Sequence, residues 1–525
     1  MPTITSLQQR LEECYRHEEV DYYMEPLVRI SDGIPVGRIK DGDTLFFCCR
    51  RGDRQIQLTE ALVDPDFGHF VVQPLPDLSV VTLVQFHDRF AHLPTIFPIL
   101  KPSETLGEVL SKAGVVQTRI AETEKSAHVT YFFNGRRVEA YGGEQWVIVP
   151  SPHSSEFLQK PATSTAEVAA AVEGAMDQQQ GQGRHFILAN LAAGDIIGHL
   201  DDWQANIDCA EAVDQSLSRI CSAAAKYGYV VAVTADHGLL EKFRKDDGSV
   251  NLSHTTSRVP FGLVVPEGGP PVGLEEADDA SLADVAPTLL TMMGIPVPGS
   301  MDGVNRASLQ GTYDRIVLVV ADGWGIGVSD PDSNPILAAR TPCMDQIAGE
   351  CPYITLAASG EAVGAHPGRS GNSETGHPTL GAGRVVLQDE LRIARALETG
   401  ELHHSQAVQQ SLEAAVRRGS DIHVLTMLTK ASSHGNMDEG LAVVQAAAAK
   451  GVKKVWLHLI LDGRSSPPQG ARDLLNTLRE RLPAGIDAEV ATVVGRGFAL
   501  DRSGDYQGKT KRTYQALVEG KGRGF

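Results

Sequence analysis

The stretch "RIVLVVADGWG", residues 315–325, is an apolar, β-branched run that ends in an aspartate followed by glycines. A short run of Val, Ile and Leu bounded by glycine is typical of a strand buried in a parallel sheet. The segment "YVVAVTADHG" (229–238) repeats this arrangement and ends in Asp236 and His237. In open parallel sheets, ligands bind beyond the carboxyl ends of the strands. The two segments therefore predict a parallel α/β sheet with acidic and histidine side chains at one edge.

Similar apolar runs recur along most of the 525 residues, and helical patterns lie between several of them. This alternation predicts mostly parallel sheets covered by helices, and the length allows two or three domains. The expected strands are residues 79–86, 146–150, 185–191, 229–235, 315–321, 421–428, 454–461 and 488–494, and two expected helices are residues 439–451 and 471–482.

The composition excludes several classes of protein. A net charge of −19 argues against a nucleic-acid-binding surface unless basic residues cluster locally. The seven cysteines include no CxxC pair, which favours reduced thiols over a disulfide framework or a zinc site. The first residues lack the apolar region of a secretory signal, and no apolar run is long enough for a membrane span. We therefore expect a cytoplasmic protein without nucleic-acid or membrane partners.

Further metal-ligand types follow other apolar runs. The segment "HFILANLAAGDIIGH" (185–199) places Asp195 and His199 four residues apart, which puts both on one face of a helix. His254 comes just before an apolar run, and Asp322 directly follows the apolar run 315–321. Taken singly, such an aspartate is most often a helix N-cap, and such a histidine a surface or core residue. Taken together, three aspartates and three histidines at one sheet edge suit two divalent cations of the Mn or Zn type.

The glycine-rich stretch "HPGRSGNSETGH" (366–377) contains Ser373. It has three interpretations: a solvated turn, a phosphate cradle, or the setting of a nucleophilic serine. No GK[ST] follows the glycines, so it is not a Walker loop. A metal on the serine oxygen would lower the pKa of the hydroxyl, and a second metal would neutralise charge on a phosphoryl group.

Ten motifs spread over almost the whole chain resemble those of the cofactor-independent phosphoglycerate mutases, which belong to the alkaline phosphatase superfamily. They are "VVADGWG", "GNSETGH", "HGNMDEG", "LDGRSSPP", "VVGRGFALDR", "RRGDR", "AETEKSAHVT", "GDIIGH", "TADHG" and "SHTT". In that family the "DGWG" strand opens the chain, whereas here it starts near residue 317 and "TADHG" and "SHTT" precede it. The chain therefore resembles a circular permutation, with the old ends joined through residues 299–315.

This resemblance implies an α/β protein: an alkaline-phosphatase-like doubly wound sheet domain plus a second α/β domain that binds substrate. In the permuted order, the metal-binding, phosphatase-like domain would be continuous over residues 100–388. The substrate domain would be built from both chain ends, residues 1–99 and 389–525. Permutation of this kind is physically mild when the new ends fall in an exposed connection.

The resemblance also implies roles for individual residues. Ser373 would accept the phosphoryl group, Lys125 would contact that group, and His434 would contact the substrate. One metal would be held by Asp195, His199 and His254, and the other by Asp322, Ser373, Asp236 and His237. The substrate's carboxylate and hydroxyls would be bound by Arg51, Arg54, Arg464, Ser465, Arg496 and Arg502.

The activity that this resemblance implies is the glycolytic interconversion of 3-phosphoglycerate and 2-phosphoglycerate through a phosphoserine, by a monomer. The cofactors would be two divalent ions without 2,3-bisphosphoglycerate; manganese is expected, with magnesium, cobalt and zinc as alternatives. Ser465 replaces the family's aspartate, and Gly497 replaces an aromatic residue. Serine is a poor base at neutral pH. A metal-dependent phosphatase, or a phosphomutase for another small phosphorylated substrate, is therefore the alternative, and a non-catalytic paralogue is the third reading.

Overall fold

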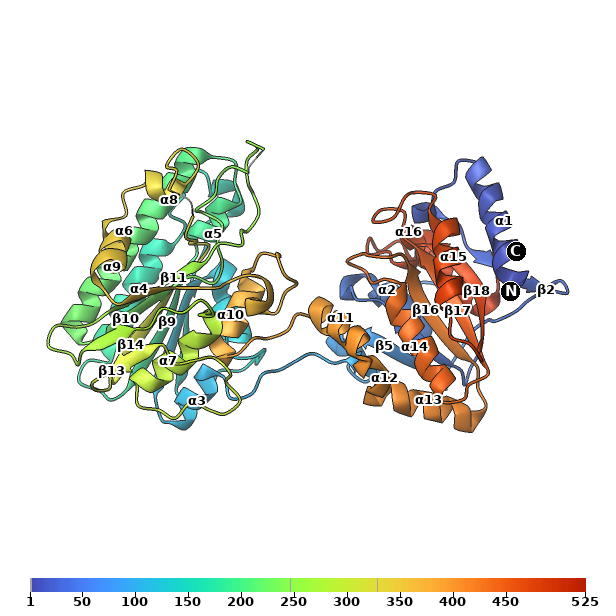
Figure 1. Ribbon diagram of the computed structural model, residues 1–525, viewed down its shortest axis with the longest axis horizontal. Coiled ribbons are helices and arrows are strands. Elements are labelled where there is room, and N and C mark those ends of the chain that lie inside the picture. Colours follow the sequence, from blue (N-terminus) through green and yellow to red (C-terminus); the bar gives the residue numbers. More distant parts are fainter. Residues whose placement is uncertain (1, 246, 328) are drawn as a thin grey trace. The chain divides into compact units, whose positions relative to one another are not determined.

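The computed structural model describes residues 2–245, 247–327 and 329–525. The chain splits into two compact units. The central unit is continuous from Leu100 to Leu391, and the terminal unit combines the segment that ends at Ile99 with Arg392–Phe525. Both chain ends, marked N and C in Figure 1, belong to the terminal unit. Among the described residues, no helix is long and apolar enough to cross a membrane.

A seven-stranded sheet forms the middle of the central unit. Its strands are β7 (Val116–Glu122), β8 (Glu144–Val149), β9 (His185–Leu191), β10 (Val230–Thr234), β11 (Val259–Val264), β14 (Arg315–Ala321) and β15 (Tyr353–Leu356). Their order is β15-β11-β10-β14-β9-β7-β8. The run from β10 to β8 is parallel, and β11 is antiparallel to both of its neighbours. A separate ribbon pairs β12 (Val272–Leu274) with β13 (Ala307–Leu309).

Helices cover both faces of this sheet, which is why its central strands are apolar without alternation. Figure 1 shows α4, α6 and α9 on one side of the sheet and α3, α7 and α10 on the other. The longest of the described helices, α6, starts where Asp202 accepts a hydrogen bond from the Ala205 amide and ends at Tyr227, directly before Gly228, whose φ is 71°. The helices are α3 (Leu106–Lys112), α4 (Thr165–Gln178), α5 (Ala193–Gly198), α6 (Trp203–Tyr227), α7 (Val285–Met292), α8 (Pro335–Ala338), α9 (Pro342–Glu350) and α10 (Ser373–Ala382).

The terminal unit contains an eight-stranded sheet that is assembled from both ends of the chain. Its strands are β1 (Leu27–Val28), β4 (Thr44–Cys48), β5 (Ser79–Val84), β6 (Thr95–Phe97), β16 (Ile422–Leu428), β17 (Lys454–Leu461), β18 (Asp487–Gly495) and β19 (Arg523–Gly524), and a small ribbon pairs β2 (Ile30–Ser31) with β3 (Ile34–Pro35). The sheet order is β19-β1-β18-β17-β16-β4-β5-β6. The early strand β4 therefore pairs in parallel with the late strand β16.

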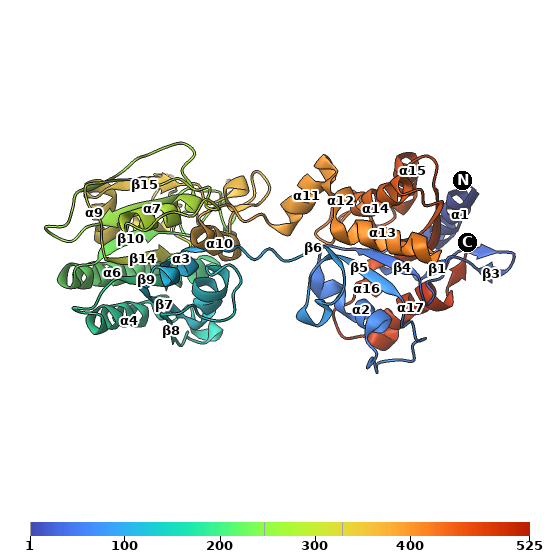
Figure 2. The ribbon, with the colours of Figure 1, turned by 90° about the horizontal axis from the view of Figure 1, so that it is seen from below.

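Figure 2 shows α13, α14 and α15 on one face of this sheet and α2, α16 and α17 on the other. Helix α14 begins two residues before the expected helix 439–451, because Asn436 caps it and Glu439 returns a bond to the Asn436 amide in a capping box. The helices are α1 (Pro2–Arg16), α2 (Ile56–Val63), α11 (Asp389–Thr399), α12 (Glu401–His404), α13 (Gln406–Arg418), α14 (Met437–Ala449), α15 (Ala471–Arg481), α16 (Arg496–Ala499) and α17 (Lys511–Tyr514).

Candidate active site

The carboxyl edge of the central sheet gathers the side chains that the sequence placed at strand ends. Asp322 follows β14, Asp236 and His237 lie two and three residues beyond β10, and Asp195 lies on α5 just after β9. His254 precedes β11. Because β11 is antiparallel to β10, its first residues lie at the same edge as the last residues of β10. The topology therefore explains how four separate loops deliver ligand types to one place.

Two histidines and an aspartate form the more open half of this site. Nε2 of His254 lies 3.1 Å from Oδ1 of Asp195 and 3.1 Å from Nε2 of His199. Nδ1 of His254 lies 2.9 Å from the carbonyl of Gly371, and Nδ1 of His199 lies 3.0 Å from that of Leu252. A carbonyl only accepts, so in the neutral rings Nδ1 carries the proton and the Nε2 lone pairs converge. Converging lone pairs beside a carboxylate fit a bound cation.

The other half of the site is buried. Asp236 and His237 are 0% exposed, Asp322 is 1% exposed and Ser373 is 5% exposed. Nε2 of His237 lies 3.1 Å from Oγ of Ser373 and 3.3 Å from Oδ1 of Asp322. Among the described residues, neither Oδ1 nor Oδ2 of Asp236 has a hydrogen-bond partner. A buried carboxylate oxygen without a donor is costly, and a divalent ion is a natural partner for it.

Ser373 stands at the first turn of α10. Asn372 caps the helix by accepting from the Thr375 amide at 3.0 Å, and the Thr375 hydroxyl accepts from the Asn372 amide at 2.9 Å. Gly376 allows close packing, because a Cβ there would lie 2.4 Å from the carbonyl oxygen of Asp236. The helix N-terminus also favours an anion near Ser373.

Lys125 links the two halves. Its Nζ lies 2.6 Å from Oδ2 of Asp195, 2.9 Å from Oδ2 of Asp322 and 2.7 Å from Oγ of Ser373. Lys125 is 4% exposed, whereas composition alone would describe a solvated charge. Burial works against its charge, but the surrounding carboxylates outweigh burial and raise the pKa of Lys125. The amine is therefore a permanent cation that donates to the serine oxygen.

The charges of this site are balanced among its own groups. Burial opposes protonation of His237, yet Asp236 and the neighbouring carboxylates raise the pKa of His237 to about 9. Burial likewise opposes ionisation of Asp195, but Lys125 and the histidines hold the pKa of this carboxyl well below its usual range. Three carboxylates, three imidazoles and one hydroxyl form a nitrogen and oxygen donor set that fits Mn²⁺ or Zn²⁺.

Sequence reasoning missed His377, which lies beside the buried half. Ligand atoms of Asp236, Asp322 and His377 all lie within 4.8 Å of one another, as do those of Asp195, His237 and His254. The available signal was the spacing in "GNSETGH", which puts His377 one helical turn after Ser373.

The second set of predicted residues lies at the carboxyl edge of the terminal sheet. We call Arg51, Arg54, Arg464, Arg496 and Arg502 the arginine cluster; they follow β4, β17 and β18. Asp53 pairs with Arg51 at 2.7 Å and with Arg502 at 2.8 Å. His434 follows β16 and is 3% exposed. Burial, and then the nearby Arg496, Arg54 and Arg51, lower the pKa of His434 to about 4.

Tyr22 and Asp462 organise the buried side of the arginine cluster. The guanidinium carbons of Arg464 and Arg496 lie 5.3 Å and 5.4 Å from the centre of the Tyr22 ring. Arg496 also forms a buried ion pair with Asp462. The other oxygen of Asp462 accepts from the Ser465 amide at 2.7 Å. Asp462 therefore holds both Arg496 and the loop in which Ser465 replaces the aspartate of the related motif.

Two polar atoms of this region are buried and unmatched. Among the described residues, Nε of Arg54 and Nε2 of His434 have no hydrogen-bond partner. Gly497 has a structural reason: a Cβ there would lie 2.7 Å from the ring of Tyr23. Tyr23 thus fills the space that an aromatic residue at position 497 would need.

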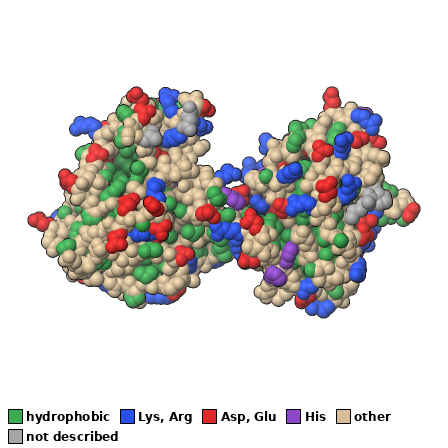
Figure 3. All heavy atoms as spheres, in the orientation of Figure 1, with side chains coloured by type: hydrophobic (Ala, Val, Ile, Leu, Met, Phe, Trp, Pro, Cys, Tyr) green, Lys and Arg blue, Asp and Glu red, His purple; other side chains and the backbone are tan. Residues whose placement is uncertain are grey.

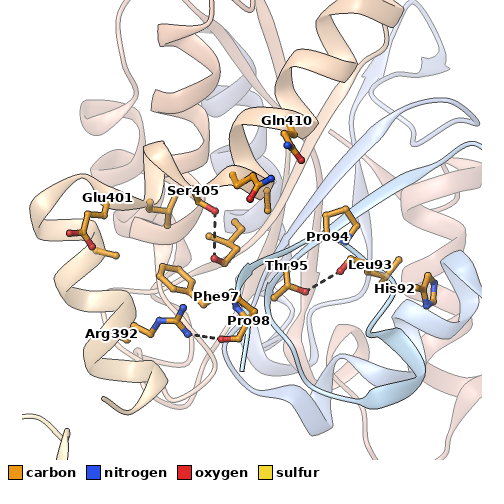
Figure 4. A pocket seen from close by; sticks show the side chains of 15 residues that line it. His92, Leu93, Pro94, Thr95, Phe97, Pro98, Arg392, Glu401, Ser405 and Gln410 are labelled. Atoms are coloured by element: carbon orange, nitrogen blue, oxygen red, sulfur yellow. Dashed lines mark hydrogen bonds between the residues drawn. The ribbon is translucent and has the colours of Figure 1, made fainter. Parts of the chain in front are cut away.

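A cavity of about 620 Å³ lies elsewhere in the terminal unit, between β6 and the helices α11 to α13 (Figure 4). There Ser405 donates to the carbonyl of Ile96 at 3.5 Å, and Arg392 donates to that of Pro98 at 2.7 Å. No predicted site residue lines it. On the face drawn in Figure 3, acidic and basic side chains are interspersed over both units.

Comparisons with known proteins agree with this geometry. Residues 68–297 match the metalloenzyme superfamily, and residues 2–88 with 393–524 match the family described as the N-terminus of BPG-independent phosphoglycerate mutase. The 2,3-bisphosphoglycerate-independent phosphoglycerate mutase of Salinibacter ruber is 39% identical over 302 residues, which are 56% of this chain and 55% of that protein. The Acinetobacter baylyi protein of the same name is 38% identical over 309 residues, 58% of each chain.

The chain thus spans little more than half the length of the curated relatives that it matches. A crystal structure of the Leishmania mexicana phosphoglycerate mutase at low cobalt concentration matches with a TM-score of 0.40 and 28% identity, over 54% of this chain and 53% of that chain. The two family matches fall mainly on the central and the terminal unit, respectively. The chain is therefore similar to the 2,3-bisphosphoglycerate-independent phosphoglycerate mutases over little more than half of its length, and most of its central unit matches the metalloenzyme superfamily.

Proposed function

We propose that the protein interconverts 3-phosphoglycerate and 2-phosphoglycerate through a phosphoserine at Ser373. The observation that carries this proposal is the set of contacts around its hydroxyl, because Lys125 lies 2.7 Å and His237 3.1 Å from Oγ. A serine hydroxyl is a weak nucleophile until a neighbouring group or metal activates it. The names of the matched relatives support the same activity.

The chain's own residues supply the acid–base part of the reaction. Lys125 donates to Oγ, so the serine hydrogen is free to point toward Asp322, whose Oδ1 lies 3.3 Å away. Attack forms the Oγ–P bond and breaks the Oγ–H bond and the P–O bond of the substrate; Oγ gives up one proton and the released oxygen takes up one, becoming a hydroxyl of glycerate. The reverse step on the other hydroxyl restores free Ser373. No phosphate and no 2,3-bisphosphoglycerate is consumed.

Two divalent ions would be held by the groups at this edge. Asp195, His199 and His254 would bind the more open ion, and Asp236, His237, Asp322 and Ser373 the buried one. When bound, the ions supply the positive charge that neutralises phosphoryl oxygens. We propose Mn²⁺ as the metal, because the donor set mixes carboxylates with imidazoles; Mg²⁺, Co²⁺ and Zn²⁺ are the competitors.

The arginine cluster would bind the carboxylate and hydroxyls of a small phosphorylated acid. Arginine presents a planar fork that suits such groups. The unmatched Nε of Arg54 and Nε2 of His434 support this role, because a bound acid would provide the missing partners. With a pKa of about 4, His434 stays neutral near pH 7 and adds no further charge to the cluster.

A second candidate function is hydrolysis by a metal-dependent phosphatase, or transfer on another small phosphorylated substrate. The observation that favours it is Ser465, which is exposed and brings no carboxylate to the loop beside Arg464. A site that cannot activate the glycerate hydroxyl would let water take the phosphoryl group instead.

The deciding experiment uses the full chain loaded with Mn²⁺ and supplied with 3-phosphoglycerate. Both 2-phosphoglycerate and free phosphate are followed over time. Formation of 2-phosphoglycerate without phosphate supports the mutase. Release of phosphate alone contradicts the mutase and favours the phosphatase. If neither product forms, both proposals are contradicted.

We further propose that the protein is a monomer in the cytoplasm. The seven free thiols support a reducing location.

A further inference from the structure

Asn190 and His377 lie behind the buried half of the site, and the proposed function uses neither of them. Both are 0% exposed. Asn190 belongs to β9, and His377 lies on α10 one turn after Ser373. Buried polar side chains are almost always paired. Here their close neighbours include two of the proposed metal-binding carboxylates, Asp322 and Asp236.

The amide of Asn190 donates in two directions. Nδ2 lies 2.7 Å from Oδ2 of Asp322 and 3.1 Å from Nε2 of His377. The opposite orientation of the amide would set its oxygen against the Asp322 carboxylate, which is repulsive. Because an amide nitrogen only donates, Nε2 of His377 is the acceptor and carries no proton.

The proton of His377 therefore lies on Nδ1. Nδ1 donates to the carbonyl of Ser373, 3.2 Å away, and also lies 3.1 Å from Oδ2 of Asp236, within ion-pair distance of that carboxylate. Each ring nitrogen of His377 is thus engaged by a protein group. The contacts form one buried chain, from Asp322 through Asn190 and His377 to Asp236.

We infer that Asn190 and His377 are positioning residues that fix the carboxylates of Asp322 and Asp236 for the buried metal ion. The inference rests on the ligands named in the proposed function. Groups that hydrogen-bond to metal ligands orient them, and their loss typically lowers metal affinity by about 10–100-fold. His377 has no lone pair left for the ion in this arrangement, so it supports a ligand without being one.

The two halves of the site have separate supports, and this makes the inference testable. The carbonyls of Leu252 and Gly371 hold His199 and His254, whereas the Asn190–His377 chain holds the other half. Loss of the chain should weaken one ion and spare the other.

The test is calorimetric titration of the metal-free full chain with Mn²⁺. We expect His377→Ala to weaken one of the two ions by about 10–100-fold and to leave the other within about twofold. His377→Asn should recover most of the affinity, because its amide can donate where Nδ1 did. Asn190→Ala should weaken the same ion, and it replaces His377→Ala if that variant does not fold.

The matched control is His185→Ala. His185 is a histidine that is also buried, at 1% exposure, and it lies on β9 with Asn190, but it bonds to Thr118 and Tyr229. Its loss should change neither Mn²⁺ affinity. Equal affinities in His377→Ala and wild type, or an equal loss at both ions, overturn the inference. Complete loss of one ion without rescue by asparagine also overturns it, because His377 would then be a ligand. A wild-type chain that binds no Mn²⁺ overturns the proposed function as well.

Discussion

The carboxyl edges of the two sheets differ in both charge and burial. At the central edge, Asp322 is 1% and Lys125 is 4% exposed, and each contacts the other. At the terminal edge, the side chains of Arg51, Asp53 and Arg502 are 39%, 42% and 53% exposed. A buried charge must be paired before any ligand arrives, whereas an exposed ion pair contributes roughly 0–1 kcal/mol. The folded chain therefore keeps the charged groups of the central site paired, whereas water competes for the ion pairs at the terminal edge.

One pair at the terminal edge breaks this division. Arg496 and Asp462 have side-chain exposures of 8% and 0%, so this pair resembles the central site more than its exposed neighbours. The guanidinium of Arg496 faces the ring of Tyr22, as does that of Arg464. The arginine cluster therefore has two parts. We call the buried Arg496–Asp462 pair its fixed base, and the exposed Arg51 and Arg502, which pair with Asp53, its rim.

The largest effect should come from the central serine. Ser373→Ala should lower conversion of 3-phosphoglycerate by about four to six orders of magnitude, because no other nucleophile replaces Oγ. Folding should persist, since Lys125 keeps Asp195 and Asp322 as partners. Turnover, thermal unfolding and Mn²⁺ binding are measured together. Full activity with normal folding would remove Ser373 from the mechanism.

Lys125→Met tests whether the central site is held by its own cation. Without metal, the variant should lose about 3–5 kcal/mol of unfolding free energy, because buried carboxylates lose their partner. Urea unfolding with a chelator measures this loss, and added Mn²⁺ should reduce it. Lys112→Met removes an exposed lysine that pairs with Glu108 and should leave stability unchanged. Equal stability of the two variants would contradict the comparison.

The fixed base and the rim of the arginine cluster can be separated by two substitutions. Arg496→Met should cost about 3 kcal/mol of stability by leaving Asp462 charged and buried, although the Ser465 amide still donates to it. Arg502→Met should not change stability, because its pair with Asp53 is exposed. Both should raise KM for 3-phosphoglycerate. A stability loss in Arg502→Met as large as in Arg496→Met would show that the rim is also part of the fold.

The lowered pKa of His434 predicts that the stability of the folded chain depends on pH. Its pKa is lowered to about 4 in the folded chain, while an unfolded histidine titrates near about 6.5. Between these values the unfolded chain binds more protons, so the stability present above pH 6.5 is lost as pH falls toward 4. The expected loss is about 1–2 kcal/mol. Unfolding of the metal-free chain against pH should show a shallower slope in His434→Gln, and an unchanged slope would refute this assignment.

The smallest effect is expected at Ser465, which is exposed and follows Arg464. Ser465→Asp should raise conversion to 2-phosphoglycerate or leave it unchanged, because the side chain is exposed and a carboxylate there meets no steric obstacle. The ratio of 2-phosphoglycerate to phosphate is the measurement. A large loss of both products would show that Ser465 has its own role in a rearranged pocket.

Much of the fold could be predicted from apolar runs. Residues 185–191, 315–321 and 454–461 are strands with the expected bounds, because short runs rich in Val, Ile and Leu without polar alternation mark strands covered on both faces. Strand β7 was missed because it carries Arg119, which is 0% exposed. Arg119 is accommodated by Gln117 at 2.7 Å and Glu144 at 3.5 Å, pairings that periodicity does not reveal.

The residues of the candidate site likewise fall into those that the local sequence predicts and those that it does not. Asp322, Asp236 and Asp195 were predicted from their places after strands. Lys125 and the arginine cluster followed only from the resemblance, because an isolated basic residue has no local signal of burial. His377 was missed because its partners come from β9 and the loop after β10, and only tertiary structure brings them together.

The pairing of β4 with β16 has a consequence for synthesis on the ribosome. β4, β5 and β6 emerge early, but the neighbour that completes their sheet emerges only after the entire central unit, roughly 300 residues later. At about 5–20 residues per second, that interval is on the order of 15–60 s. During it, the apolar edge of β4 is an open template for wrong partners. The central unit, whose sheet is complete within one stretch of chain, can fold in the meantime, so nascent-chain quality control should recognise the first hundred residues before any other part.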